Sequence, residues 1–401
     1  MTGKGTGAIS TVQVFGDTAE TIIREVFKPV GSKAAEFKTG KILLGTINDG
    51  SETIDQVTIG CEGPNGFAIH CHGNPLIVEM IMQLLQRLGA ELVTAEQLLA
   101  KTLTAQEHLN TIAVEARLAQ IKAKTLQGTK IIANQIDAGL GKKAKEWLQN
   151  INTISLDEMA AEAQSILKNS QTAKLIINGC KVAIVGPPNT GKSTLLNCLA
   201  GRQKAIVTEI KGTTRDWVSA RCQIGPLSVE LIDTAGLDEK LVATAKDSVE
   251  KAAQRKTAEI LEEADLVLLV LDGSQTADQL DDRLFEKIPG KLVPSTSSGQ
   301  ALSEIEGKVL TLLNKSDLPA KFDTAMLPEM LGNTVQISAK FGTGIENLTE
   351  KIREACGVAD FDLQQPVCFT SRQEDLLGQL KKAKSKQEAA LIITELLNGK
   401  V

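Results

Sequence analysis

Aromatic side chains are scarce in this sequence. Tyrosine is absent, and aromatic residues make up only 3% of the 401 positions. Aliphatic side chains must therefore fill the interior, and a hydrophobic content of 42% is ample for that. Long apolar runs are missing as well, because the longest, residues 266–271, is far too short to span a bilayer. We expect a globular chain that does not contact membranes.

Cysteine usage and charge exclude further classes of protein. The seven cysteines are an odd number and contain no CxxC pair, so a disulfide framework is not expected. No apolar stretch follows the first residues MTGKGTGAIS, which predicts no signal peptide. The net charge of -5 argues against a constitutive nucleic-acid coat protein but is compatible with a local basic patch. The sequence therefore predicts a cytoplasmic protein.

Periodicity divides the chain into four segments. The first has short strand-like runs at 8–15 and 54–61 and helix-like runs at 17–27 and 75–88, which predicts a small α+β domain. Helical patterns precede and follow a stretch of alternating strands and helices, and the last of them covers 370–397. This order predicts an α/β domain with a mostly parallel sheet, inserted into an α-helical domain. The expected segments are 1–93 (α+β), 94–178 (helical, first part), 179–358 (inserted α/β) and 359–401 (helical, second part).

A phosphate-binding loop opens the inserted domain. GPPNTGKS, residues 186–193, fits the pattern GxxxxGK(S/T), and it follows an apolar strand and starts a helix, as the motif requires. Its backbone N–H groups and the helix N-terminus attract phosphate oxygens. Lys192 should reach the β- and γ-phosphates, and Ser193 should bind Mg²⁺. The expected contacts from this loop are Gly186, Asn189, Thr190, Gly191, Lys192, Ser193 and Thr194.

A second apolar strand ends in IDTAG. The motif places the Asp233 carboxylate where it can hold Mg²⁺, directly or through water. Gly236 lies where its backbone can sense the γ-phosphate, and Thr234 and Ala235 complete the expected contact segment. The sequence therefore predicts a nucleoside triphosphate site with bound magnesium.

The motif NKSD, residues 314–317, selects the base. The Asp317 carboxylate can accept hydrogen bonds from guanine N1–H and from the 2-amino group. Adenine offers neither donor, so ATP would leave the carboxylate unpaired. Asn314 and Lys315 should buttress the loop and the ring. This motif predicts guanine rather than adenine.

A fourth motif, SAK, follows another strand and comprises Ser338, Ala339 and Lys340. The backbone N–H of Ala339 is placed to donate to guanine O6. Because the four motifs occur in the order typical of GTPases, we interpret the chain as a GTP-binding and GTP-hydrolysing enzyme.

This chain lacks the glutamine that positions the attacking water in Ras-like GTPases, so hydrolysis requires another group. Ras-like enzymes position water with a glutamine after DxxG, and Leu237 occupies that place. The sequences GPPNTGKS, AIVTEIKGTTRD and LIDTAGL resemble the TrmE–Era–EngA group of GTPases. AIVTEIKGTTRD followed by VEK closely resembles the MnmE (TrmE) family of tRNA modification GTPases.

The resemblance implies activation by potassium, when two G domains meet face to face around the ion. Asn189 matches the family's potassium-binding asparagine, and residues 208–213 match the loop that completes the ion's shell. Thr214 matches the switch threonine near Mg²⁺. The implied ligands are Asn189, Thr208, Ile210 and Thr213 for K⁺, and Ser193, Thr214 and Asp233 for Mg²⁺.

Glu250 aligns with the family's water-orienting glutamate, if about five extra residues precede it. A surface glutamate on a helix is the alternative. Arg215 offers another, as an arginine finger in cis, which we rank below a structural pairing role. The expected catalytic residues are thus Glu250, Lys192 and Asn189.

The flanking segments extend the resemblance. GAISTVQVFGDTAETIIREVF, DGSETIDQVTI and GPNGFAIHCHGNP resemble the family's N-terminal domain, which dimerises and binds a tetrahydrofolate one-carbon donor. The resemblance implies a cytoplasmic homodimer that acts on tRNA with an FAD-containing partner resembling MnmG. Three departures argue against folate binding and full modification competence: the family's acidic loop between the GPN and His-Gly strands is missing, TAEQL (94–98) replaces an RPGEF-like stretch, and the end LNGKV lacks the family's cysteine.

Two other functions stay open. A ribosome-assembly GTPase such as Era or Der is disfavoured by the single G domain and by the lack of a GXXG loop in the last segment. A regulatory switch that has lost the modification role fits the departures.

Two residue clusters have structural and functional interpretations. Cys61, His70, Cys71 and His72 suggest a metal, but neighbouring strand residues point to opposite faces, so we favour structural roles. Lysines on two helical stretches could contact tRNA phosphates, and a solvated helix face is the favoured alternative. These are Lys142, Lys143, Lys145, Lys381, Lys382 and Lys384.

Overall fold

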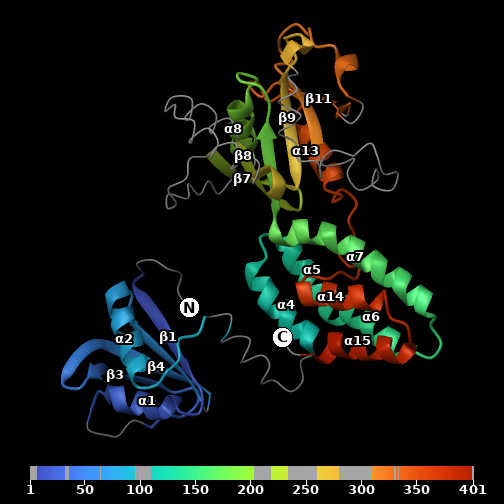
Figure 1. Ribbon diagram of the computed structural model, residues 1–401. Helices are drawn as coiled ribbons and strands as arrows, with labels where there is room; N and C mark the ends of the chain where they lie inside the picture. The colour runs from blue at the N-terminus through green and yellow to red at the C-terminus, as the bar shows by residue number, and fades with distance from the viewer. Residues whose placement is uncertain are drawn as a thin grey trace, which may run out of the picture. The chain divides into compact units, whose positions relative to one another are not determined.

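The computed structural model describes residues 7–31, 36–63, 65–94, 97, 110–202, 218–233, 260–279, 309–328, 331–332 and 334–399. The chain forms two compact units, Met1–Glu107 and His108–Val401 (Figure 1). None of the helices in the described parts has the length and apolar content that a bilayer crossing needs.

The first unit is a five-stranded antiparallel sheet in the order β1-β5-β4-β3-β2, with helices on one face. Alternating apolar residues of the strands and the apolar stripes of the helices share one hydrophobic cluster, which includes Ile23, Ile59, Phe67, Ile69 and Ile81. The predicted α+β domain is confirmed. Its elements are β1 (Ile9–Phe15), α1 (Ala19–Val26), β2 (Phe27–Pro29), β3 (Ile42–Asp49), β4 (Glu52–Gly63), β5 (Gly66–His72) and α2 (Pro75–Arg87).

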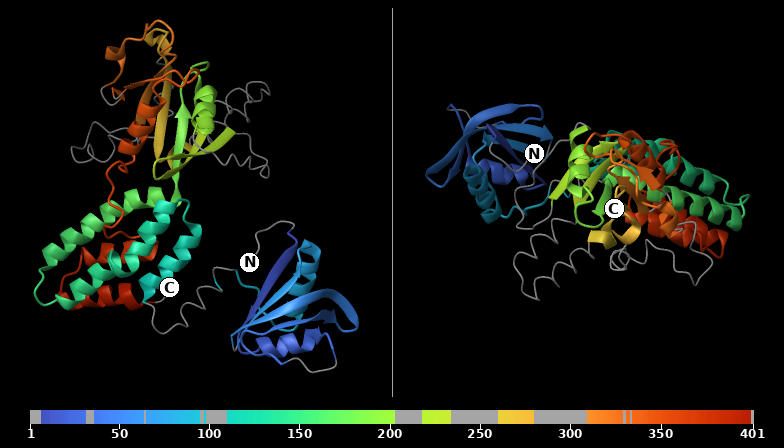
Figure 2. Two further views of the ribbon diagram at one scale, coloured as in Figure 1. Left: turned by 180° about the vertical axis from the view of Figure 1, so that it is seen from behind. Right: turned by 90° about the horizontal axis from the view of Figure 1, so that it is seen from above.

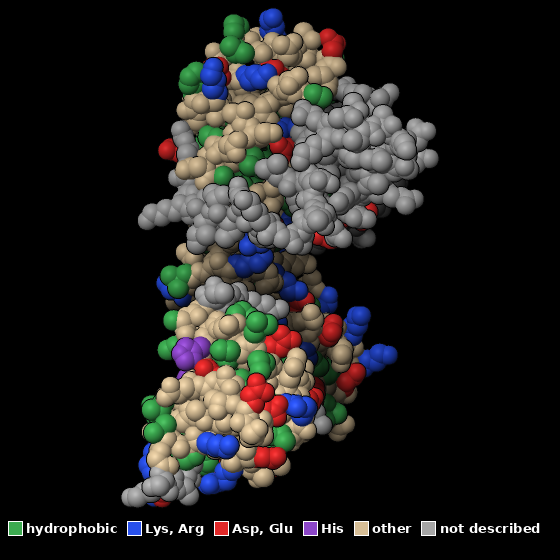
Figure 3. All heavy atoms as spheres, turned by 90° about the vertical axis from the view of Figure 1, so that its left-hand side faces the viewer, with side chains coloured by type: hydrophobic (Ala, Val, Ile, Leu, Met, Phe, Trp, Pro, Cys, Tyr) green, Lys and Arg blue, Asp and Glu red, His purple; other side chains and the backbone are tan. Residues whose placement is uncertain are grey.

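The opposite face of this sheet carries exposed apolar side chains. Successive strand residues point to opposite faces, and the register pairs Ile9 with His72 and Leu44 with Thr58 on the face away from the cluster. Ile9, Phe15, Ile42 and Leu44 are 61%, 50%, 71% and 48% exposed. Figure 3 shows apolar side chains and a histidine on the surface of the molecule. The described helices of this unit pack on the other side.

Six helices of the second unit form a bundle (Figures 1 and 2). Most begin at a Ser, Thr or Asn whose side chain accepts a hydrogen bond from a free N–H group of the first turn, as for Asn110, Thr125, Ser155, Thr370 and Ser385. The helices are α4 (Thr111–Lys122), α5 (Leu126–Asp137), α6 (Leu140–Gln149), α7 (Leu156–Asn178), α14 (Ser371–Leu380) and α15 (Lys386–Asn398).

The two C-terminal helices complete a bundle that the first four begin. Glu115 on α4 is buried, and its carboxylate accepts hydrogen bonds from Arg372 (2.8 and 2.9 Å) and from Gln373 (2.7 Å). Arg372 also donates to the carbonyl of Glu395 in the last turn of α15. Arg372 and Gln373 lie on α14, far from Glu115 in sequence. Their hydrogen bonds to this buried carboxylate therefore hold the first and second parts of the helical domain together. The predicted split helical domain is confirmed.

A six-stranded sheet lies between the two halves in sequence. Its order is β11-β10-β9-β6-β8-β7, and neighbours run parallel except for β7 with β8. Both faces are covered, so the strands are continuously apolar, and residues 266–271 are at most 1% exposed. The mostly parallel sheet is confirmed. Its elements are β6 (Cys180–Val185), α8 (Lys192–Arg202), β7 (Val218–Ile224), β8 (Leu227–Asp233), β9 (Leu266–Asp272), β10 (Val309–Asn314), β11 (Thr334–Gln336) and α13 (Ile345–Ala355).

The chain enters and leaves this α/β part at neighbouring points. Cys180 begins β6, Cys356 follows α13, and their Sγ atoms lie 3.8 Å apart in a buried position. The thiol contact and burial raise the pKa of Cys180, so this residue is not a reactive thiolate. An inserted domain requires its first and last residues to lie close together, because the chain leaves the helical domain and returns to it at neighbouring points.

Candidate nucleotide-binding site

The phosphate loop joins β6 to α8 in a conformation that only small residues allow. Gly186 and Gly191 have φ angles of 146° and 93°. A Cβ on Gly186 would lie 2.1 Å from the Val270 carbonyl oxygen, and one on Gly191 would lie 2.3 Å from Asn314 Nδ2. Both glycines therefore allow the loop to curl against its neighbours. Asn189 has a φ of 61° and is exposed at this loop.

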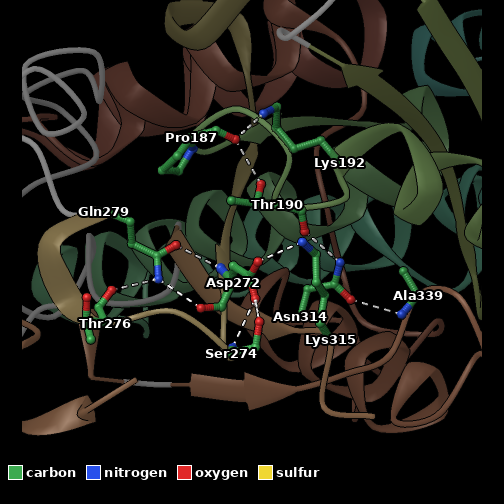
Figure 4. A network of polar contacts seen from close by, with 10 residues as sticks. All are labelled: Pro187, Thr190, Lys192, Asp272, Ser274, Thr276, Gln279, Asn314, Lys315 and Ala339. Atoms are coloured by element: carbon green, nitrogen blue, oxygen red, sulfur yellow. Dashed lines mark hydrogen bonds and ion pairs between the residues drawn. The ribbon is translucent and has the colours of Figure 1, made fainter. Parts of the chain in front are cut away.

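Lys192 begins α8 and is held by the loop itself. The side chain is buried, and Nζ donates hydrogen bonds to the carbonyl oxygens of Gly186 (2.9 Å) and Pro187 (2.6 Å). The Thr190 hydroxyl donates to the same Pro187 carbonyl at 3.0 Å (Figure 4). A fixed ammonium group thus lies beside the N-terminus of a helix, and this arrangement favours anions.

Ser193 and Asp233 are brought together as the sequence predicts. Asp233 ends β8 next to β6, and the Ser193 hydroxyl donates to its Oδ2 at 2.6 Å. A hydroxyl and a carboxylate are hard oxygen ligands of the kind that Mg²⁺ takes, with nucleotide phosphates and water completing its shell. Among the described residues there is no group of three His, Cys, Asp or Glu side chains that could hold a metal alone. The pair therefore fits a Mg²⁺ that arrives with a phosphate ligand.

Asn314 connects three parts of the site. The side chain is buried at the end of β10, and Nδ2 donates to the Thr190 carbonyl oxygen at 2.7 Å. Its Oδ1 accepts the Ala339 backbone N–H at 2.9 Å (Figure 4). One amide thus joins the phosphate loop, the NKSD segment and the SAK segment. The Ala339 N–H expected at guanine O6 is engaged with Asn314, so donation to the base requires a shared hydrogen bond.

The remaining NKSD and SAK side chains lie around the same edge of the sheet. Asp317 is exposed, and its Oδ1 accepts a hydrogen bond from the Ser338 hydroxyl at 2.6 Å. This hydrogen bond orients the carboxylate while leaving it accessible. Lys340 is exposed beside the ring of Phe341, with Nζ 5.1 Å from the ring centroid.

Sequence reasoning missed Asp272. This carboxylate ends β9, pairs with Lys315 Nζ at 2.6 Å and is 6% exposed. Burial raises the pKa of the Asp272 carboxyl, but the hydrogen bonds from Lys315 and Ser274 outweigh it and hold that pKa below its usual range. The sequence offered only an aspartate at the end of an apolar run, because the pairing of β9 with the NKSD strand is known from the structure alone.

Several predicted site residues lie outside the described residues. They are Thr208, Ile210, Thr213, Thr214, Thr234, Ala235, Gly236 and Glu250, and Arg215 belongs with them. The potassium shell, the switch threonine and the water-orienting glutamate therefore stay predictions.

The cysteine–histidine cluster forms no metal site in the described structure. His70 Nδ1 lies 2.9 Å from the Thr11 hydroxyl, and His72 Nδ1 lies 2.7 Å from Asp55 Oδ1. Burial raises the pKa of the Cys61 and Cys71 thiols. The two histidines thus have hydrogen-bonding partners within the sheet.

The similarity of this chain to known proteins is not confined to the nucleotide-binding site. A family model described as a 50S ribosome-binding GTPase matches residues 181–297. The tRNA modification GTPase MnmE of Clostridioides difficile is 28% identical over 97% of this chain and 88% of its own length. Its counterpart in Enterococcus faecalis is 29% identical over 99% of this chain and 87% of its own length. Among solved structures, the G domain of the T. maritima FeoB iron transporter matches 44% of this chain and 98% of its own, at 29% identity and a TM-score of 0.31.

The relative from Lactobacillus acidophilus, also named tRNA modification GTPase MnmE, is 30% identical over 96% of this chain and 85% of its own length. The match covers both flanking parts as well as the G domain. The chain is therefore a GTPase, and GTP with Mg²⁺ is the nucleotide complex that the site accommodates. Identity of this extent shows that the chain belongs to the MnmE family of tRNA modification GTPases.

Proposed function

We propose that this chain is a GTP-driven switch that acts in wobble-uridine (C5) modification of tRNA. The observation that carries the proposal is the match to MnmE relatives along 96% of the chain, because a shared G domain alone would not extend into the helical and N-terminal parts. We propose the domains as 1–93, a helical domain of 94–178 with 359–401, and a G domain of 179–358.

GTP would lie across the loops that Asn314 joins. The phosphate loop and the start of α8 would bind the triphosphate, with Thr194 and the segment Thr234–Gly236 beside it. Lys192 would place its charge on the β- and γ-phosphates, where negative charge develops during transfer. Ser193, Thr214 and Asp233 would hold Mg²⁺, which neutralises phosphate charge when bound.

On the guanine side, Asp317 would accept the two donors of the base, with Ser338 fixing the carboxylate. Asn314 would keep the loops in register, and Lys315, Ala339 and Lys340 would line the base. These residues follow β10 and β11, which are neighbours in the sheet, so both segments would reach the base from one edge.

Activation would depend on a second copy of the chain. Asn189 is exposed on the phosphate loop, so its side chain is accessible to an approaching G domain. Asn189, Thr208, Ile210 and Thr213 would bind a K⁺ that supplies positive charge near the γ-phosphate, and Glu250 would orient water. The assignment of these ligands comes from the family resemblance.

Potassium dependence is the direct test of this activation. We expect GTP turnover to fall at least about tenfold, or roughly 1.4 kcal/mol of transition-state stabilisation, when sodium replaces potassium. Asn189→Ala should show the low rate in both salts, because the side chain that binds the ion is gone. GTP turnover measured by phosphate release at constant ionic strength checks this. Equal rates in the two salts would favour Arg215 as a finger in cis.

The N-terminal unit would hold the dimer together. The sheet face bearing Ile9, Phe15, Ile42 and Leu44 is apolar and exposed, and a second copy of the same face would cover it by two-fold symmetry. A tetrahydrofolate derivative would be the family's ligand there, but TAEQL (94–98), in place of the family's RPGEF-like stretch, argues against it in this chain. An FAD-containing partner resembling MnmG would supply the redox chemistry.

A genetic experiment tests the proposed role. In a strain that lacks this chain, wobble-uridine modification should be lost, and the wild-type chain should restore it while a Lys192→Ala chain should not. Mass spectrometry of tRNA nucleosides measures the outcome. Unchanged modification would favour the regulatory switch, and co-sedimentation with ribosomal subunits would favour ribosome assembly. The lysines for which a solvated helix face is favoured over tRNA contact, Lys142, Lys143, Lys145, Lys381, Lys382 and Lys384, lie on or next to helices of the bundle.

A further inference from the structure

Asp272 is a buried carboxylate placed directly beside the guanine-loop lysine. It is the last residue of β9 and pairs across the sheet with Asn314. Its Oδ2 accepts a hydrogen bond from Lys315 Nζ at 2.6 Å. Its Oδ1 accepts the backbone N–H and the hydroxyl of Ser274, at 2.9 and 2.6 Å (Figure 4).

The backbone around Asp272 is fixed from two further sides. Its N–H donates to Gln279 Oε1 and its carbonyl accepts from Gln279 Nε2, both at 2.9 Å. The N–H of the next residue, Gly273, donates to the Asn314 carbonyl oxygen at 2.9 Å. The turn from Asp272 to Gln279 is therefore a rigid support that is hydrogen-bonded to the end of β10, where the NKSD segment starts.

Lys315 needs such a support. It has a φ of 64°, in the left-handed region that side chains other than glycine rarely adopt. Its side chain is long and loses much rotamer freedom when it is ordered. The side chain is 33% exposed, so solvent alone would leave it mobile. The ion pair with Asp272 holds the Lys315 ammonium group in place and so restricts the conformation of the lysine's methylene groups.

We propose that Asp272 is a positioning residue for guanine-nucleotide binding, which orders Lys315 before the nucleotide arrives so that the lysine stem forms one wall of the base site. The inference rests on the proposed function, which assigns residues 314–317 to the guanine base. Asp272 acts through Lys315 and need not touch the nucleotide. Without this ordering, nucleotide binding would have to immobilise the Lys315 side chain, and the lost conformational entropy would weaken the affinity.

A double-mutant cycle tests the inference. We expect Asp272→Ala to weaken GDP binding about tenfold, as when one ordered lysine becomes mobile, while kcat for GTP stays within about twofold. Lys315→Ala should weaken GDP binding at least as much. The double variant should then bind no more weakly than Lys315→Ala, because Asp272 has no other route to the nucleotide. Calorimetric titration of GDP in the presence of Mg²⁺ measures the dissociation constants, and additive losses would overturn the proposal.

Controls separate positioning from folding. Asp272→Asn keeps the shape and an oxygen for Ser274 but loses the charge, so it should bind GDP more weakly while a cooperative thermal transition shows that it is still folded. Glu263→Ala breaks an exposed ion pair with Lys181 that also measures 2.6 Å, and it should bind GDP normally. If wild-type protein binds ATP as tightly as GTP, the proposed function fails. If it prefers GTP and a folded Asp272→Asn protein binds GDP normally, this inference alone fails.

Discussion

Replacing Lys192 with alanine should lower kcat/KM for GTP hydrolysis by roughly 1000-fold or more. Removing a single preorganised donor from a reaction's charge-stabilising site costs about 100- to 1000-fold in kcat, and Lys192 would also bind the ground-state triphosphate. Its ammonium is already buried within the loop, held by the Gly186 and Pro187 carbonyls. No other described lysine donates to these carbonyls, so we expect no side chain to take over its role.

The matched control is Lys181→Ala. Lys181 belongs to β6, which leads into the same loop, but its side chain is 44% exposed and its Nζ pairs with Glu263. Exposed pairs of this kind contribute about 0–1 kcal/mol, so turnover should be nearly unchanged. Phosphate release and calorimetric GDP titration on both variants, with Tm as the folding check, measure the difference. A folded Lys192→Ala protein with normal turnover would contradict the proposed phosphate site.

The parts of the fold that depend on local pattern could be predicted. The apolar run that ends in IDTAG indicated a strand, which is β8, and GPPNTGKS indicated a strand–loop–helix whose glycines the structure shows to be sterically required. The region 370–397 was wrongly interpreted as one helix, because Lys381–Ser385 breaks it. The Ser385 hydroxyl accepts the Glu388 N–H, and this Ser-x-x-Glu pattern is a helix-start signal that was present in the sequence.

The parts of the site that depend on distant neighbours could not be predicted. Nothing local to NKSD shows that the Asn314 amide reaches Thr190 on one side and Ala339 on the other. That knowledge requires the strand order, which places β9 between β6 and β10. The same order brings Asp272 beside Lys315, whereas the sequence separates them by a long segment. Motif spacing selected the candidate residues, and the order of the strands determines which of the described ones touch.

Replacing Asp317 with asparagine should change the preferred base from guanine to xanthine. Guanine presents two donors, N1–H and the 2-amino group, to a carboxylate that accepts both. An asparagine offers one acceptor and one donor, so its NH₂ faces the 2-amino group of guanine, donor against donor. Hydrogen bonds to charged groups contribute about 1.5–3 kcal/mol each, so GTP affinity should fall by roughly 100- to 10,000-fold.

Xanthine replaces the 2-amino group with an oxygen and keeps N1–H, so it matches both atoms of the asparagine amide. The structure supports a clean exchange, because Asp317 is exposed and the Ser338 hydroxyl that now donates to Oδ1 can donate to an amide oxygen as well. Competition of GTP and XTP for hydrolysis by the wild-type and Asp317→Asn proteins measures the effect. Glu346→Gln removes a carboxylate near the start of α13 and should leave the preference for GTP intact. Retained GTP preference in Asp317→Asn would mean that another group reads the base, since a neutral amide cannot pair with both guanine donors.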